Sequence, residues 1–187
     1  MKPDPIPHPM TRAEYRRWLE TQPERPRYEL VSGEPIAMAP ERRGHVRTKA
    51  RVWRALDAAI TAAGLDCEAL ADGIAVPISD DTEFEPDAVV ECGVIESDDT
   101  TDSLNPIIIV EVLSPSTKHI DTGLKLSGYF TLPSVRHYLI VRTDRRMVIH
   151  HRRAGPDGPI ATNLLSGGRL DLDPPGLSVD LADFFAR

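Results

Sequence analysis

Two carboxylates stand within apolar segments that have the character of buried strands. Glu111 interrupts the apolar run from Ile107 to Leu113, and Asp87 follows Pro86 at the start of another apolar stretch. A carboxylate in a buried strand is costly without a cation or a strong hydrogen-bonding partner. Two such groups on adjacent strands form a hard oxygen site suited to Mg²⁺ or Mn²⁺. That metal can activate a water and stabilise charge on a phosphoryl group.

A hydrolytic site also needs a cation or base beside the attacking water, and Lys125 is the candidate. It lies on a helix expected over about 118–132, where Asp121 and Tyr129 share its face at spacings of four residues. The spacing alone favours an ordinary surface pair between Asp121 and Lys125. A catalytic role for Lys125 therefore needs support from other features of the sequence.

Two other hydrolytic chemistries can be weighed against a metal site. Asp87 and Glu111 could be the acid and base of a glycosidase, but no aromatic residues surround them to hold a sugar. Ser114 and Ser116 lack the Gly-x-Ser-x-Gly pattern of a serine hydrolase elbow, so we expect them to shape a turn and cap the next helix.

The segment from about His45 to Ala63 has the pattern of an amphipathic helix that ends at Gly64. Its first half and the residues before it are strongly basic, so this face either is simply solvated or contacts phosphates. The basic residues are Arg42, Arg43, Arg47, Lys49, Arg51 and Arg54. His45 could join His150 and His151 at a transition metal, but adjacent histidines in a strand point to opposite faces.

The charge of the chain is unevenly distributed. Its 187 residues carry a net charge of −7, whereas nucleic-acid-binding domains are usually basic. The stretch 55–117 contains 15 acids, Asp87 and Glu111 among them, and no bases. The rest of the chain contains 22 bases and 14 acids. The central acids suit a cation, and the basic remainder suits an anionic partner.

The elements expected around these residues are short helices and strands in one domain covering 1–187. We expect an irregular arm over 1–10, a core over about 11–151, and a C-terminal extension over 152–187 with edge strands and a small helix. Thr11 and Glu14 form a capping box for a helix over about 11–20, and two strands follow around a turn at 32–34. Glu29 lies in the first of these strands.

Cys67 and Cys92 lie far apart in the sequence, and the chain begins without an apolar signal segment, so we expect a reducing, cytoplasmic setting. No apolar run approaches the roughly 20 residues of a membrane span. We therefore expect no membrane role.

Several of these strings resemble the Uma2 family of restriction-endonuclease-like proteins. The resemblance covers about residues 11–151 and rests on Pro86-Asp87, on Ile108-Ile-Val-Glu-Val-Leu-Ser-Pro-Ser-Thr117, and on Lys125 with Tyr129. Tyr28-Glu-Leu-Val-Ser-Gly-Glu34, His45 and His137-Tyr-Leu-Ile-Val141 also fit it. The resemblance implies an α/β fold of the PD-(D/E)XK nuclease type, with a mixed sheet flanked by helices, and metal-dependent phosphodiester hydrolysis.

The resemblance also implies roles for individual residues. Asp87 and Glu111 match the acidic metal ligands, and Glu29 matches a glutamate that assists them or equally faces water. The family motif places a lysine two residues after the second acid, where this chain has Leu113. Lys125 matches a lysine on the following helix that could reach the same position.

The leading hypothesis is therefore a nuclease in which Asp87, Glu111 and Glu29 hold Mg²⁺ or Mn²⁺ and Lys125 orients or activates the attacking water. The alternative is an inactive nuclease fold that acts as a DNA-binding or interaction module, as Leu113 and the acidic total charge suggest. DNA is the expected substrate. The resemblance also allows a homodimer, in which each active site cuts one strand.

Overall fold

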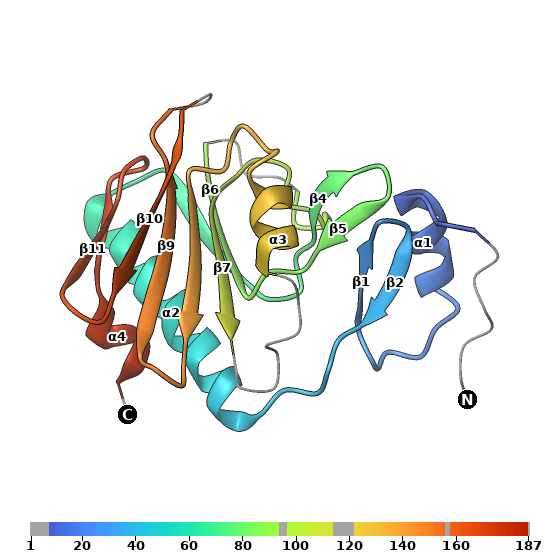
Figure 1. Ribbon diagram of the computed structural model, residues 1–187, viewed down its shortest axis with the longest axis horizontal. Coiled ribbons are helices and arrows are strands. Elements are labelled where there is room, and N and C mark those ends of the chain that lie inside the picture. Colours follow the sequence, from blue (N-terminus) through green and yellow to red (C-terminus); the bar gives the residue numbers. More distant parts are fainter. Residues whose placement is uncertain (1–7, 94–96, 114–121, 156–157, 187) are drawn as a thin grey trace.

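The apolar run around Glu111 forms β7 (Pro106–Leu113), a central strand of a six-stranded sheet with the order β10-β9-β8-β7-β6-β3. The computed structural model describes residues 8–93, 97–113, 122–155 and 158–186. β7 pairs in parallel with β8 and antiparallel with β6, so the sheet is mixed. The expected mixed sheet flanked by helices is thus confirmed (Figure 1).

The other strands of this sheet are β3 (Cys67–Ala71), β6 (Ala88–Cys92), β8 (His137–Arg142), β9 (Met147–Arg153) and β10 (Ile160–Leu165). The helices are α1 (Arg12–Leu19), α2 (Arg43–Ala63), α3 (Thr122–Tyr129) and α4 (Leu181–Phe185). A smaller sheet has the order β2-β1-β5-β4, and β11 pairs with β12 as a separate hairpin. These strands are β1 (Tyr28–Val31), β2 (Glu34–Ala37), β4 (Val76–Ser79), β5 (Thr82–Phe84), β11 (Arg169–Leu172) and β12 (Leu177–Asp180).

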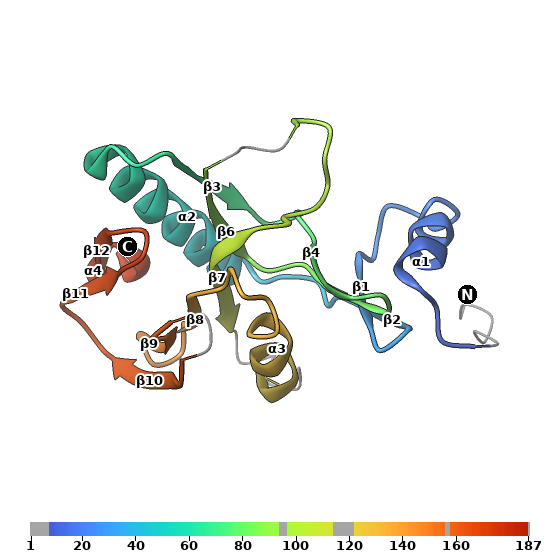
Figure 2. The same ribbon diagram turned by 90° about the horizontal axis from the view of Figure 1, so that it is seen from above.

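The two faces of the six-stranded sheet are covered by different helices, because alternate residues of each strand point in opposite directions. Ile108, Val110 and Val112 of β7 belong to the apolar cluster that contains α2, whereas Ile109 belongs to the cluster that contains α3. Figure 2 shows α2 and α3 on opposite sides of β7. Glu111 has the parity of Ile109 and therefore lies on the α3 side.

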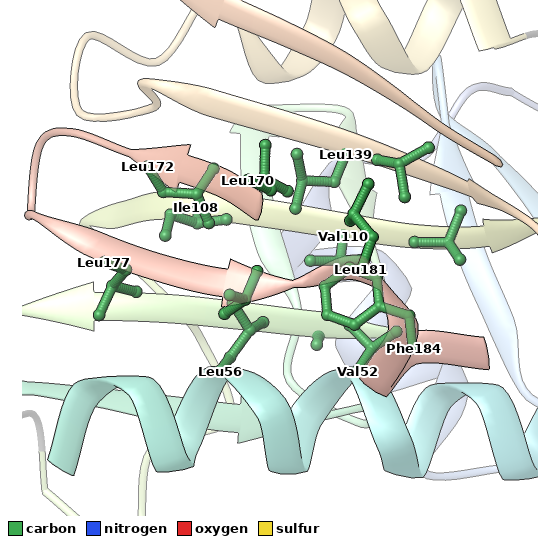
Figure 3. Packing of buried hydrophobic residues seen from close by; sticks show 14 of the residues in the cluster. Val52, Leu56, Ile108, Val110, Leu139, Leu170, Leu172, Leu177, Leu181 and Phe184 are labelled. Atoms are coloured by element: carbon green, nitrogen blue, oxygen red, sulfur yellow. The ribbon is translucent and has the colours of Figure 1, made fainter. Parts of the chain in front are cut away.

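The larger cluster is packed between α2, the sheet and the C-terminal elements (Figure 3). Val52 and Leu56 of α2 are fully buried there, against Leu172 of β11 and Phe184 of α4. Each such side chain contributes about 1.5–3 kcal/mol by leaving water. Residues of the C-terminal extension, after the end of the expected core at 151, thus contribute directly to the packing that holds α2 in place.

The N-terminal elements include β1, the strand that carries Glu29. The expected capping box of α1 is present, with Thr11 and Glu14 each bonded to the backbone of the other. The turn between β1 and β2 has positive φ at Ser32 and Gly33, at 49° and 80°, which matches the expected hairpin turn. β1 also pairs with β5, which makes this hairpin part of the smaller sheet.

Two strands and one covalent link were not expected from the sequence. β3 is rich in Ala and Glu, which have low strand propensity, and β5 has only three residues. Cys67 and Cys92 face one another across β3 and β6 and form a disulfide, which the expected reducing setting did not predict. In the described part of the chain, no helix is long and apolar enough to cross a membrane.

Candidate active site

Lys125 is the central cation of a buried cluster. α3 places its Nζ 2.8 Å from Oε1 of Glu29 and 2.8 Å from Oε1 of Glu111. The Tyr129 hydroxyl, one turn further along α3, donates to the same Glu111 oxygen at 2.8 Å. All four side chains are buried, and Lys125 is only 4% exposed. Lys125 therefore reaches Glu111 from the following helix, as the resemblance implied.

Glu29 belongs to this cluster and does not face water. It is 4% exposed, and its Oε1 also accepts a hydrogen bond of 2.8 Å from the Glu85 backbone N–H. Its position follows from the pairing of β1 with β5, which turns the inner face of the hairpin toward α3. The interpretation of Glu29 as a solvated hairpin residue is therefore wrong.

Asp87 lies directly before β6, whose first residue, Ala88, pairs with Val110 of β7. Its backbone N–H donates to the Val110 carbonyl at 2.9 Å, and its Oδ2 accepts the Val112 N–H at 2.5 Å. The charge of Asp87 helps to raise the pKa of Glu111, so the two carboxylates are close enough to interact.

The cation that contacts Asp87 is Lys49 of α2, at 2.9 Å from Oδ1. The same Nζ lies 2.5 Å from Glu41 and 2.6 Å from Asp72, and Lys49 is only 6% exposed. His45, one turn earlier, brings its Nε2 to 3.5 Å from Asp87 Oδ2. Lys125 thus contacts Glu111, whereas the ion-pair partners of Asp87 come from α2.

Lys49 was predicted only as one base of a solvated or phosphate-contacting helix face, and a signal for its burial was present. The buried stripe of α2 runs through Ile60, Leu56 and Val52. Continued toward the N-terminus in steps of three and four, it reaches Lys49 and then His45. Tyr129 was likewise noticed only as a neighbour of Lys125 on one helix face.

The pKa values of the cluster follow from burial and from the neighbouring charges. Burial, together with the charges of Asp87 and Glu29, raises the pKa of Glu111 to about 7, although Lys125 opposes this shift. Burial alone would raise the pKa of Asp87, but His45, Lys49 and the Val112 N–H lower it. Burial acts to lower the pKa of Lys125, but Glu111 and Glu29 raise it, so its amine stays protonated.

The donor atoms of this cluster suit a hard divalent cation. Carboxylate oxygens are the side-chain ligands that Mg²⁺ and Mn²⁺ prefer. The raised pKa of Glu111 also reflects an excess of negative charge at this position, which a cation would relieve. Over the described residues, however, no three His, Cys, Asp or Glu side chains stand close enough together to form a ready set of ligands. Asp87 and Glu111 instead hold lysine ammonium groups, so a metal would share or displace these contacts.

The cavity next to these residues reaches Asp87, and neither Glu111 nor Lys125 lines it. Asp87 and Lys49 line a cavity of about 990 Å³, together with Trp53, Asp72 and Arg27. The Trp53 indole donates to the Ala69 carbonyl at 2.8 Å, which fixes the ring in the cavity wall. A substrate in this cavity would meet Asp87 before it met Glu111.

The remaining candidates do not assemble into a second site. His150 contacts His137, with Nε2 and Nδ1 2.8 Å apart, and the His151 ring contacts Thr162, so neither joins His45 at a shared metal. Ser114, Ser116 and Asp121 lie outside the described residues. The predicted surface pair between Asp121 and Lys125 therefore stays untested.

The fold and the buried acidic and basic residues together define a restriction-endonuclease-like protein. A family model described as "Putative restriction endonuclease" matches residues 12–182, and the chain belongs to this family, Uma2. It is 31% identical over 171 residues to an uncharacterized protein of Synechocystis sp., covering 88% of this chain and 85% of that protein.

A solved structure supports the fold. The chain superimposes with a TM-score of 0.74 on a crystal structure from Anabaena variabilis described as a "putative nuclease". The superposition covers 95% of this chain and 98% of that one, at 14% sequence identity. This likeness concerns the fold alone.

Proposed function

We propose that the chain hydrolyses phosphodiester bonds of DNA at the cluster formed by Glu29, Asp87, Glu111 and Lys125, in the presence of Mg²⁺ or Mn²⁺. The observation that carries the proposal is the burial of Asp87, directly before β6, and of Glu111 on the neighbouring strand β7, with a buried lysine on Glu111. Burying three carboxylates beside one another opposes folding, and the lysines offset only part of this cost. Such costly groups are typical of sites kept for chemistry.

In this proposal Asp87 and Glu111 would hold the metal, and Glu29 would assist from β1. A metal bound there would supply an activated water and would stabilise the charge that develops on the phosphoryl oxygens. Asp87 is suited to this role because its lowered pKa keeps it ionised. The Val112 N–H fixes one of its oxygens, which sets the direction in which the carboxylate presents the other.

Lys125 would orient the attacking water and stabilise the transition state, but it would not remove a proton. Its pKa is raised by Glu111 and Glu29, so the amine is an ammonium that can only donate hydrogen bonds at neutral pH. Its two ion pairs hold it rigidly within the cluster. Lys125 would thus supply the positive charge that the family motif places at the position occupied here by Leu113.

The proposal is tested by incubating supercoiled plasmid and a linear duplex with the protein and Mg²⁺ or Mn²⁺. We expect nicked and linear products from the wild type, and no products when EDTA is present. Asp87→Asn should lose the activity, because an amide cannot supply the anionic ligand. Asp80→Asn, at an exposed position of the β4–β5 turn, is the matched control. Cutting by Asp87→Asn at the wild-type rate would refute the proposal.

A second candidate function is DNA binding without cleavage. Leu113 at the motif position favours it, as does the occupation of both strand carboxylates by lysines. This candidate predicts a protein that binds the duplex and leaves it intact at all metal concentrations. A homodimer and a cytoplasmic setting stay predictions.

A further inference from the structure

A basic hollow lies beside the site, at the start of α2. Four arginines surround it: Arg42, Arg47 and Arg51 from α2 and its N-cap, and Arg146 from the turn between β8 and β9. Its volume is about 560 Å³, and His45 and Phe185 also form part of its wall. The arginines thus come from segments about 100 residues apart in the sequence, and the fold brings them to one concave surface.

The positive charge of this hollow is not neutralised by the protein. Within the described ranges, no carboxylate forms an ion pair with any of the four arginines, although the chain as a whole has a net charge of −7. The arginines on the opposite side of the molecule behave differently, because Arg12 and Arg16 of α1 both pair with Glu83. Like charges one helical turn apart destabilise a helix, as with Arg47 and Arg51. An anionic ligand would relieve this repulsion.

The backbone conformation at Arg146 is unusual for an arginine, which indicates that its side chain is needed at this position. Arg146 has φ of 47°, in the left-handed region where residues other than Gly, Asn and Asp are uncommon. Its guanidinium lies over the Phe185 ring, 5.5 Å from the centroid, and this contact holds it at the hollow. A glycine or asparagine would suit this turn better, so an arginine here is not explained by the turn itself.

The basic hollow is joined to the proposed active site through His45. This side chain lines the hollow, is 8% exposed, and directs its Nε2 toward Asp87 at 3.5 Å. Nε2 has no hydrogen-bond partner among the described residues. One buried side chain thus separates the guanidinium groups from the carboxylate that faces the larger cavity.

A nucleic-acid strand fits this arrangement better than a small anion does. A duplex strand presents a phosphate every 3.4 Å or so along its axis, so one phosphate in the hollow can place the neighbouring phosphodiester near Asp87. Guanidinium groups bind phosphate oxygens through paired hydrogen bonds. We propose that the basic hollow binds a backbone phosphate of the DNA strand whose neighbouring phosphodiester lies at Asp87. This inference rests on the proposed function and adds the contact that would position the substrate.

The test measures binding without cleavage. A fluorescently labelled duplex is titrated with protein in EDTA over a range of salt concentrations, and anisotropy gives the affinity. Arg47→Gln, Arg51→Gln and Arg146→Gln should each weaken binding several-fold. Each should also lower the slope of log affinity against log salt concentration by about 0.9 per lost phosphate contact. Arg17→Gln, at an exposed position of α1, is the control and should match the wild type.

The following binding results would overturn the inference. They are wild-type affinity and slope in the three variants, an equal loss in the Arg17→Gln control, and absence of wild-type binding at low salt. Polyglutamate that competes as well as unlabelled duplex would also overturn it, because the hollow would then accept any polyanion. Thermal melting of each variant confirms that it is folded.

Failure of the proposed function gives a different pattern. A wild type that binds DNA through the arginines but never cuts it with Mg²⁺ or Mn²⁺ would refute the nuclease activity and leave the phosphate site intact. A wild type that cuts DNA, with arginine variants that bind and cut equally well, would refute the phosphate site alone.

Discussion

Replacing Lys125 by Met should destabilise the fold strongly and in a pH-dependent manner. The substitution keeps an unbranched side chain but removes two buried ion pairs of 2.8 Å, with Glu29 and Glu111. Breaking a buried pair by removing one partner costs about 3–5 kcal/mol, because the other charge is left uncompensated. We expect a loss of that size in the free energy of unfolding at pH 8.

The loss should become smaller as the pH falls. Without Lys125, the folded-state pKa of Glu111 rises above its present value of about 7, and further above that of the unfolded chain. The folded variant then binds more protons than the unfolded one, so its stability decreases as pH rises from about 4.5 through the folded-state pKa. At pH 5 the Glu111 carboxyl is largely neutral, and its share of the penalty disappears.

Urea unfolding followed by circular dichroism measures both effects, with the slope on denaturant checked for constancy. Ser127→Ala, at an exposed position of the same helix, should change stability by less than about 0.5 kcal/mol. The double variant with Glu111→Gln should recover part of the loss at pH 8. A loss below about 1 kcal/mol at pH 8, or an equal loss at both pH values, would contradict the buried ion pairs.

Three further predictions concern other groups. Calorimetry should show Mn²⁺ binding that strengthens as pH rises through about 7, where Glu111 loses its proton. Glu111→Gln should abolish this pH dependence. Equal heats for the wild type and this variant would contradict the shared site. Burial lowers the pKa of His137 to about 3 and of His150 to about 4, so the unfolded chain binds more protons below pH 6.5. Their contribution to stability is complete above pH 6.5 and lost as the pH falls toward 4, and His150→Gln should flatten that dependence in urea unfolding. Reduction of the Cys67–Cys92 disulfide opens a loop with a sequence separation of 25 and should lower stability by about 3 kcal/mol, whereas Cys92→Ser should make the protein insensitive to reductant.

The parts of the fold that could be predicted are those fixed by local patterns. The capping box located α1, and the apolar run from Ile107 to Leu113 located the buried strand β7 that contains Glu111. Gly64, with φ of 62°, ends α2 where the sequence predicted. Each of these features depends on residues within one or two helical turns or on strand parity, so the information is present in a short window.

The partners of the carboxylates could not be predicted from such windows. Asp87 meets Lys49 because α2 packs across the end of β6, a contact between residues 38 positions apart. Glu29 and Lys125 are 96 positions apart, and only the pairing of β1 with β5 brings them together. The family resemblance supplied Lys125, whereas helical spacing alone favoured a surface pair. The disulfide likewise follows from the β3–β6 register, which was not predicted.

Initial rates of plasmid nicking in Mn²⁺ test whether the carboxylates of Asp87 and Glu111 support phosphodiester cleavage. Wild type, Glu111→Gln and the Asp80→Asn control should be purified identically and shown to melt as folded proteins. We predict nicking by the wild type and the control, and a rate for Glu111→Gln that is lower by at least about two orders of magnitude, as expected for loss of a group acting in the transition state. Equal rates for Glu111→Gln and the wild type, or absence of nicking by all three proteins, would contradict the account.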